Sequence, residues 1–303
     1  SPVETTRILE AAGIDIVGLA NNHIMDCGQP GLRETVQRLD AAGIRYFGAG
    51  RTLAEAREPL LVVAGGKKVA ILGRNGRPRW HTATRSRGGV APLSIKECRK
   101  AVSDLEGRDI DLVMLQLHFG EELYKTPWPA RMKMLDRLAR ITNLDVIICG
   151  HQHIYQGVLR FNGKTVLLSS GNLLMDVSTY FQRDELARCG CATTLSLDEV
   201  GCWAVDELPF EIFPTGVGLA SEWAADQLFA YVDYVKEVVG DRKRLRQEWQ
   251  NECLRRLSRS RGSAKRKAQH FIKRSDKKRV LRGWLHTRIW LLIRSRLHRN
   301  VFW

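Results

Sequence analysis

Short apolar runs alternate with segments of helical periodicity over the first 150 residues of this 303-residue chain. Each apolar run has the length of a buried strand, and strands that alternate with helices are typical of a layered sheet. We expect strands at 14–20, 45–48, 60–64, 68–73, 111–117 and 144–149, and helices at 3–12, 30–42, 53–57, 94–106 and 129–142. The alternation therefore predicts the α/β class.

The pattern changes after His153, where antiparallel pairing is expected. Asn162-Gly163 lies between two apolar runs, and this dipeptide is the strongest short-range signal for a β-hairpin. The predicted antiparallel pairs are 155–161 with 165–170, and 191–197 with 202–213. From Leu219 onward the periodicity is helical. We therefore expect mixed β-sheets flanked by helices, followed by a helical C-terminal tail.

A long polar segment interrupts the alternation at residues 74–92. It carries five arginines among glycines and prolines, namely Arg74, Arg77, Arg79, Arg85 and Arg87. We expect a loop over these residues, placed where it would cover the ends of neighbouring strands. Loops of this length are either functional or simply mobile, and both interpretations stay open.

The basic charge is concentrated in the C-terminal region. The net charge is +15, yet residues from Lys236 onward hold 22 Lys and Arg against 5 Asp and Glu, whereas residues 1–235 hold 26 against 28. Charge runs are commonly solvated helix faces or disordered arms. We expect a domain at 1–216, N-terminally incomplete, and a basic, mainly helical extension at 217–303.

The end of this extension combines tryptophans with arginines. An apolar face at helical spacing is formed by Trp284, Leu285, Ile289, Trp290, Leu292, Ile293, Leu297 and Val301. A cationic helix rich in tryptophan suits an anionic bilayer, so residues 282–303 are expected to contact an anionic membrane surface or an anionic polymer. Docking of this face on the rest of the chain is an alternative. Nucleic acid ranks lower, because no recognised binding motif is present.

Seven cysteines are scattered at positions 27, 98, 149, 189, 191, 202 and 253. Their odd number, and the apolar runs around several of them, favour buried free thiols in a reducing compartment over a disulfide framework. Cys189, Cys191 and Cys202 lack the fourth ligand of a structural zinc site, so ordinary thiols are the preferred interpretation.

Targeting signals are absent from the sequence as given. No segment reaches the roughly 18 consecutive apolar residues that a spanning helix needs, and none has the pattern of a signal peptide. A cytoplasmic location and a peripheral membrane location both stay open. Because the chain starts at Ser1 and not at Met, we expect a processed, trimmed or incomplete N-terminus.

Three predicted strands end in histidine, in the segments Ala20-Asn21-Asn22-His23, Leu117-His118 and Gly150-His151-Gln152-His153. In α/β sheets ligands bind at the carboxyl ends of the strands, so the three segments can converge. Imidazole is the commonest side-chain ligand of transition metals, and an amide oxygen adds a hard donor. A single histidine of this kind is more often a capping or hydrogen-bonded residue. The closely spaced pair His151 and His153 favours a metal.

Segments along residues 3–176 match a known family in order and spacing. They are Ala20-Asn21-Asn22-His23-x-x-Asp26-x-Gly28, Ala42-Gly43-Ile44, Gly48-Ala49-Gly50, Gly66 to Gly73, His118-Phe119-Gly120-Glu121-Glu122, Gly150-His151-Gln152-His153-Ile154-Tyr155-Gln156 and Leu168 to Asp176. These segments resemble the CapA family of bacterial capsule and poly-γ-glutamate synthesis proteins. The family is related to the calcineurin-like metallophosphoesterases. The resemblance therefore implies a metallophosphoesterase-like layered sandwich around a pair of divalent metals.

The resemblance also implies roles for individual residues. The implied metal ligands are Asn22, His118, His151 and His153, the catalytic residues His23 and Asp26, and the substrate-binding residues Glu122 and Asn172. His23 would contact the scissile group or protonate the leaving group, and Asp26 would orient His23 or cap the following helix. One or two divalent ions, of Mn, Fe, Zn or Mg, would polarise an oxygen and supply hydroxide at neutral pH.

The sequence departs from the family pattern at its start. Family members have a Gly-Asp motif and an Asn-Leu-Glu motif upstream of the helix predicted at 3–12, and these motifs hold most of the first metal. Either the chain is an N-terminally truncated piece, which the Ser1 start favours, or it is a diverged member that binds one metal or none. Gly-His-Gln-His also stands where many members have His-Pro-His, which keeps the spacing of the two histidines.

Three functional hypotheses follow. The first is a CapA-like metal-dependent hydrolase of capsule, poly-γ-glutamate or exopolysaccharide biosynthesis, acting on an anionic polymer or a phosphoester. The second is a non-catalytic accessory that uses the same fold and the tail to hold a polymer or a membrane. The third, nucleic-acid binding through the tail, predicts steeply salt-dependent binding to any duplex. A catalyst should depend on His23, and an accessory on residues 241–303.

Overall fold

The computed structural model describes residues 4–76, 79–173, 184–197, 203–214 and 216–259. Two compact units are present, Ser1–Leu245 and Arg246–Trp303. The described residues of the second unit belong to the C-terminal part of helix α7, which spans Arg242–Arg259. The domain division expected at residue 216 stays a prediction.

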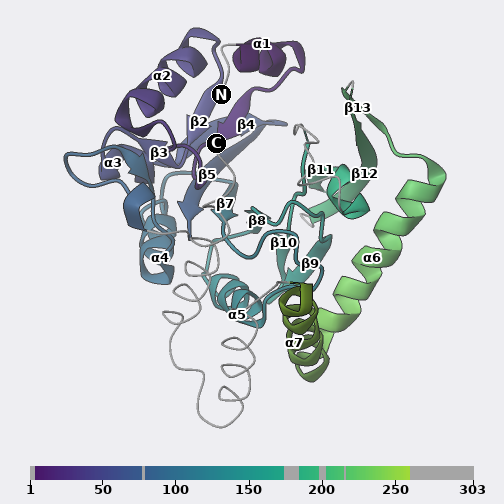
Figure 1. The fold of residues 1–303 in the computed structure, drawn as a ribbon. Helices are drawn as coiled ribbons and strands as arrows, with labels where there is room; N and C mark the ends of the chain where they lie inside the picture. The colour runs from purple at the N-terminus through teal and green to yellow at the C-terminus, as the bar shows by residue number, and fades with distance from the viewer. Residues whose placement is uncertain (1–3, 77–78, 174–183, 198–202, 215, 260–303) are drawn as a thin grey trace. The chain divides into compact units, whose positions relative to one another are not determined.

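A six-stranded mixed sheet forms the centre of the first unit (Figure 1). In the order β4-β5-β7-β8-β10-β9, its strands are Leu60–Ala64, Lys67–Asn75, Leu112–His118, Val146–Gly150, Lys164–Leu167 and Val158–Phe161. The four central strands are parallel, and β4 and β9 pair antiparallel at the two edges. The predicted mixed sheet is therefore confirmed.

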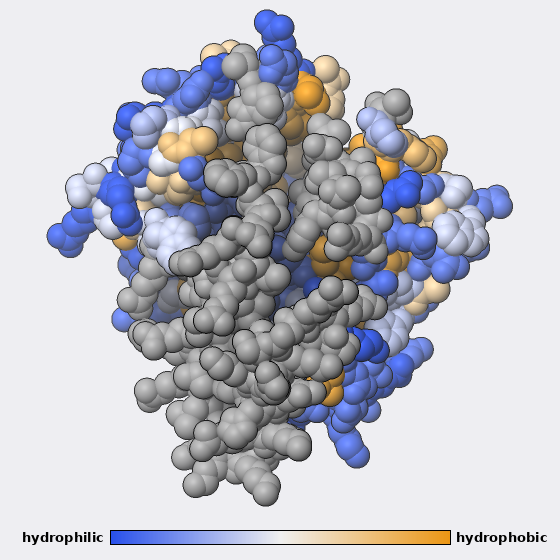
Figure 2. Space-filling view, viewed as in Figure 1, coloured by the Kyte–Doolittle hydropathy of each residue, from blue (hydrophilic) through white to orange (hydrophobic). Residues whose placement is uncertain are grey.

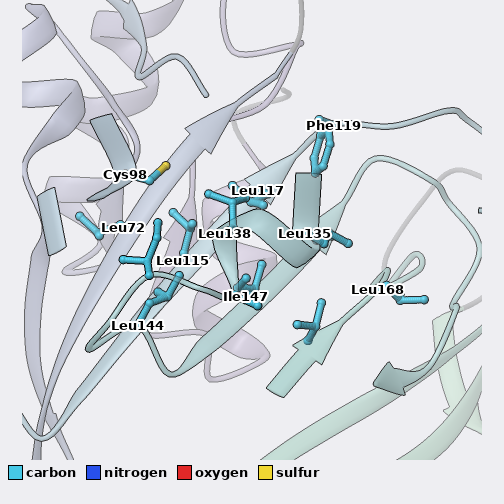
Figure 3. Packing of buried hydrophobic residues seen from close by; sticks show 14 of the residues in the cluster. Leu72, Cys98, Leu115, Leu117, Phe119, Leu135, Leu138, Leu144, Ile147 and Leu168 are labelled. Carbon is cyan, nitrogen blue, oxygen red and sulfur yellow. The ribbon is translucent and has the colours of Figure 1, made fainter. Parts of the chain in front are cut away.

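Helices pack on one face of this sheet. They are α4 (Ile95–Ser103), α5 (Pro129–Leu138) and the C-terminal half of α6 (Glu222–Gly240). The N-terminal half of α6 packs in a separate cluster with Tyr155, Cys189 and Cys191. The buried cluster between sheet and helices includes Leu72, Leu115, Leu117, Cys98, Leu135 and Leu138 (Figure 3). Alternate residues of the parallel strands supply the sheet side of the cluster, since successive side chains of a strand point to opposite faces.

Truncation of Leu135 should test this packing. Its side chain is completely buried, so Leu135→Ala is expected to lower the free energy of unfolding by about 2–5 kcal/mol in urea denaturation. Leu61 on β4 is 48% exposed, and Leu61→Ala should change that free energy by less than about 0.5 kcal/mol. Equal losses in the two variants would contradict this description of the core.

Two smaller sheets cover the opposite face. One pairs β1 (Ile16–Gly18) with β2 (Arg45–Phe47) in parallel, and the other contains β11 (Cys189–Leu197), β12 (Trp203–Phe213) and β13 (Gly216–Leu219). Ile16 of β1 and Leu195 of β11 pack against Val69, Leu112 and Val146 of the central sheet. The chain thus forms a layered sandwich of sheets with flanking helices, as predicted.

The sheet of β1 and β2 lies very close to β5. A Cβ atom at Gly73 of β5 would lie 2.8 Å from the Cα of Gly48, and Gly48 has a φ of 85°. Only glycine tolerates both the positive φ at Gly48 and the close approach of the two backbone segments at Gly48 and Gly73. Helices α1 (Glu4–Ala11) and α2 (Gly28–Ala41) flank β1 in the sequence. The segment after β1 contacts the end of β7, where Asn22 lies beside His118.

The predicted loop at 74–92 is wrong in part. This region contains the 3₁₀ helix Arg79–His81 and strand β6 (Gly89–Val90). The other short elements of the unit are β3 (Ala49–Gly50), α3 (Leu53–Arg57) and the 3₁₀ helix Glu185–Arg188. Arg74 and Asn75 are the last residues of β5. The guanidinium of Arg74 is buried, donates to the Gly73 carbonyl at 2.7 Å, and has its pKa lowered by that burial. The end of this strand is therefore predicted as loop, because Arg74 is a charged residue type and yet is buried in β5.

Both predicted antiparallel pairs are confirmed. Asn162 and Gly163 have φ angles of 49° and 78°, the two positive values that a type I′ hairpin turn requires between β9 and β10. Strands β11 and β12 pair from Cys189 opposite Glu211 to Leu197 opposite Trp203. The predicted start of the second strand at residue 202 lies outside the described residues.

The six cysteines among the described residues are all free thiols. Cys98, Cys149, Cys189 and Cys191 are buried, and Cys253 is half-buried. The prediction of buried thiols is wrong for Cys27, which is exposed just before α2. Cys202 lies outside the described residues.

Alkylation should separate these thiols. Burial, followed by the charge of Glu207, raises the pKa of Cys191 to about 12, so its reactive thiolate is scarce at neutral pH. Iodoacetamide is expected to label Cys27 in the native chain and Cys191 only after unfolding, as peptide mass spectrometry would show. Faster labelling of Cys191 than of Cys27 would contradict the placement of both.

Within the described part of the chain, no helix has both the length and the apolar character needed to cross a membrane. The predicted membrane-contacting or polymer-contacting segment 282–303 lies outside the described residues, so its role stays a prediction.

Candidate functional site

The carboxyl ends of β7 and β8 bring two of the three histidine segments together. His118 is the last residue of β7 and lies opposite Gly150 of β8, so His151 follows at the same edge of the sheet. The His118 and His151 rings have centroids 4.7 Å apart. Adjacent parallel strands therefore place these two imidazoles side by side, as the strand-end argument predicts.

The third segment reaches the same edge from β1 through Asn22. Its Oδ1 lies 2.6 Å from Nε2 of His118, and its side chain is largely buried. The preceding Asn21 has a different role, because its Oδ1 accepts hydrogen bonds from the backbone N–H groups of His23 and Ile24 at 2.8 and 2.9 Å. Of the two asparagines, one shapes the turn and the other faces the site.

His23 forms the outer part of the same network. Its Nδ1 lies 2.8 Å from Oδ2 of Asp26, and its Nε2 lies 3.2 Å from Nδ2 of Asn22. A carboxylate only accepts, so Nδ1 carries the proton of the neutral ring and Nε2 accepts from the asparagine amide. Asp26 does not cap α2, since Cys27 holds the N-cap position without a side-chain cap bond. Of the two roles expected for Asp26, the contact with His23 is the one present.

His151 is held in an unusual backbone conformation. His151 and His153 have φ angles of 100° and 60°, a region that residues with a Cβ rarely occupy. The His151 side chain is almost fully buried, and its Nε2 lies 3.4 Å from Oε1 of Glu122. Backbone strain of this kind clusters at binding and catalytic sites.

Asn172 fixes the orientation of His153. The Asn172 amide nitrogen donates to the backbone carbonyls of His153 and Ala187 at 3.3 and 2.9 Å, so its Oδ1 must be the acceptor for Nδ1 of His153 at 2.7 Å. Nδ1 therefore carries the proton, and the lone pair is on Nε2. A metal-binding histidine usually donates its other ring N–H to such an acceptor. The His151 and His153 ring centroids are 6.2 Å apart.

Two further residues at this edge are absent from the sequence-based site. Asn75 ends β5 directly opposite His118 and is buried, but the predicted loop at 74–92 concealed it. Gln152 is buried between the two strained histidines. A strand prediction extended by two residues would have found Asn75, whereas the sequence pattern carries no signal for Gln152.

A buried arginine lies next to the segments that follow β7 and β8. Arg131 of α5 is 1% exposed, donates from Nη1 to Oε1 of Gln156 at 2.8 Å, and has its guanidinium 5.9 Å from the centroid of the Phe119 ring. Burial lowers the pKa of Arg131 and raises that of the Cys149 thiol. Arg131 therefore links α5 to Phe119, which follows His118, and to Gln156, which follows the segment of His151 and His153.

The donors at this edge suit a divalent metal in chemistry. Asn22 Oδ1 and His118 Nε2 are 2.6 Å apart, which is slightly closer than two ligands of one ion, since these stand about 3 Å apart at bond lengths near 2.1 Å. Among the described residues, however, no three His, Cys, Asp or Glu side chains are grouped as a ready metal cage. The fit therefore depends on the amide oxygen of Asn22 as a ligand beside the imidazoles.

Comparison with known proteins relates this chain to capsule synthesis proteins. The family model described as bacterial capsule synthesis protein PGA_cap matches residues 1–177. The capsule biosynthesis protein CapA of Bacillus anthracis is 28% identical over 178 residues, which covers 57% of this chain and 43% of that protein. The PGA biosynthesis protein CapA of Bacillus subtilis is 26% identical over 183 residues, covering 60% and 48%. The chain spans less than half the length of these relatives.

Among solved structures, the sulfate thiohydrolase SoxB of Thermus thermophilus is similar with a TM-score of 0.47 at 14% identity, covering 76% of this chain and 38% of that chain. A likeness at this level supports no functional conclusion. The family match is different in kind, because it spans more than half of the sequence and includes all eight predicted site residues. The chain therefore belongs to the PGA_cap family of bacterial capsule synthesis proteins.

Proposed function

We propose that this chain is a divalent-metal-dependent hydrolase of capsule polymer synthesis, which cleaves a phosphoester or an amide-type bond. The observation that carries the proposal is the convergence of Asn22 Oδ1 on His118 Nε2 beside the His151 ring, at the carboxyl edge of the central sheet. Imidazole donors suit Fe or Zn, whereas Mg and Mn favour oxygen donors, of which Asn22 supplies one.

Asn22, His118 and His151 would hold the metal, with Glu122 beside His151 and with His153 turned toward a second position. A bound divalent ion would act as a Lewis acid on an oxygen of the substrate. Binding would require the hydrogen bond between Asn22 and His118 to open, because both atoms of that bond would become ligands. Asn172 would keep His153 in the tautomer whose Nε2 has a lone pair.

His23 would serve as the proton donor to the leaving group. Its side chain is 65% exposed, so a substrate can reach it, and Asp26 holds its Nδ1. This contact fixes the orientation of the ring and leaves Nε2, the nitrogen next to Asn22, as the atom that would carry the transferred proton. The ring is therefore oriented to deliver a proton beside the proposed metal position.

The polymer context comes from the relatives. Two of them are named for capsule or PGA biosynthesis, which supports an anionic polymer as the substrate or as a bound partner. The 22 Lys and Arg from Lys236 onward add a positive charge that suits such a polymer. A non-catalytic role in holding the polymer is the second candidate, and this charge is the observation that favours it.

The test is hydrolysis by the purified chain after chelation and reloading. The metal-free chain and samples reloaded with Mn²⁺, Zn²⁺ or Mg²⁺ would be assayed on an aryl phosphodiester and on poly-γ-glutamate. We expect hydrolysis of at least one substrate that depends on the metal. Metal binding without any hydrolysis would favour the polymer-holding role, and a folded chain that binds no metal would refute the proposed site.

A further inference from the structure

We propose that Gln152 is a positioning residue, which ties two histidine loops together and so holds the backbone of His151 and His153 in place. The first loop contains residues 118–123 and the second contains residues 150–154. The inference rests on the proposed function, because it concerns how the proposed ligands are aimed. It adds a residue to which the family resemblance gave no role.

The second loop needs an external constraint. A left-handed backbone costs a residue with a Cβ about 1–3 kcal/mol. The loop contains two such residues, His151 and His153, one on each side of Gln152. Strain of this size persists only when surrounding contacts determine the conformation. Since relaxation of the backbone would turn both rings, whatever holds residue 152 also holds the directions of His151 and His153.

Gln152 supplies that constraint through two hydrogen bonds to the first loop. Its Nε2 donates to the backbone carbonyl of Phe119 at 2.5 Å, and its backbone carbonyl accepts from the N–H of Leu123 at 2.8 Å. One residue of the second loop is therefore fastened at two points to the loop that starts at His118. These two hydrogen bonds couple the second loop to the first.

The packing around the amide is close. Gly120 has a φ of 124°, and a Cβ there would overlap the Gln152 amide nitrogen and lie 3.2 Å from Cδ of Arg131. Gln152 itself is 1% exposed. The Gln152 amide is therefore packed directly against Gly120 of the first loop, at a position that admits no side chain larger than that of glycine.

The Gln152 amide also lowers the stability of the fold, because one of its atoms is buried without a hydrogen-bond partner in the part of the chain that the structure describes. Its Oε1 is buried and makes no hydrogen bond within the described residues. A buried acceptor without a partner destabilises a fold by about 1–3 kcal/mol, so a residue that serves only stability would be apolar here. The single bond to Phe119 is the contact that the amide provides and an apolar side chain would not.

The test compares Gln152→Met with a matched control. Methionine keeps the length of the side chain and removes the donor. Gln29→Met makes the same change at a glutamine of α2 that also ties distant segments, since its amide exchanges hydrogen bonds with Gly88 at 2.8 and 3.0 Å. Two quantities would be measured for each chain, namely Co²⁺ affinity from visible absorption and hydrogen exchange of the backbone amides in both loops.

We expect Gln152→Met to weaken Co²⁺ binding about 10- to 100-fold, the loss typical of a residue that orients ligands. It should also speed amide exchange at 118–123 and 150–154, with and without metal. Gln29→Met should change neither quantity. Wild-type Co²⁺ affinity in Gln152→Met would overturn the proposal, whatever the exchange rates are.

Failure of the proposed function gives a distinct result. If the wild-type chain binds no Co²⁺, the metal site is refuted, and exchange of the metal-free chain alone decides whether Gln152 ties the loops. Faster exchange confined to the two loops would support the tie, and unchanged exchange would overturn it. Should Gln152→Met not fold, Gln152→Asn, which keeps the amide but shortens its reach, takes its place under the same criteria.

Discussion

His118→Ala is expected to remove the bound metal and to lower hydrolysis at least 100-fold, beyond the roughly 10- to 100-fold cost of losing an orienting partner. The imidazole of His118 contributes one proposed ligand atom and is the hydrogen-bond partner of the other, Oδ1 of Asn22. Its removal therefore disturbs two ligands at once. Elemental mass spectrometry of the dialysed chain, beside the phosphodiester assay, would measure both effects.

Two variants separate loss of a ligand from damage to the fold. His81 is a buried histidine that is not among the proposed ligands, and His81→Ala should keep metal and activity even if it lowers stability. Asn22→Asp keeps an oxygen at the ligand position and should retain metal. If His118→Ala kept its metal, or if His81→Ala lost it, the assignment of the site to the edge of β7 would be wrong.

The elements that the sequence predicts correctly are those specified by local chemistry. The hairpin at Asn162-Gly163 follows from a dipeptide that tolerates positive φ at both positions, and the parallel strands follow from apolar runs of the right length. The juxtaposition of His118 with His151 could be anticipated as well. Both residues end strands of one parallel sheet, and such strands share their carboxyl edge.

The errors arise where burial overrides residue type. Arg74 is polar by type but buried in β5, so a polar run that begins with it predicts a loop. The same error hid Asn75, whose place opposite His118 depends on the register of β5 and β7. Register is set by tertiary pairing, which no local pattern encodes.

Contacts between distant segments required the fold itself. The bond between Asn22 and His118 joins residues 96 positions apart and depends on the close approach of Gly48 to Gly73. The strained φ angles at His151 and His153 have no sequence signature, because histidine seldom adopts them. For these features the family resemblance supplied the candidate residues, and the structure supplies the contacts between them.

His23→Ala should leave the metal in place and lower turnover by about 10²–10⁴-fold, the usual contribution of a general acid. The ring is not among the proposed ligands, and its hydrogen bonds to Asp26 and Asn22 orient it toward the metal position. The loss should depend on the leaving group. An alkyl phosphodiester, whose alkoxide needs a proton, should lose more than a nitrophenyl ester, whose phenolate leaves without one.

This dependence distinguishes proton donation from simple substrate positioning. Steady-state rates of His23→Ala on both esters would be compared with those of Asp26→Ala, which keeps the imidazole but removes its anchor and should show a smaller loss of the same kind. Glu34→Ala breaks an exposed pair with Arg38 on α2 and should leave both rates unchanged. An equal loss on the two esters would mean that His23 binds the substrate without protonating it, since a general acid acts only on the bond whose leaving group needs the proton.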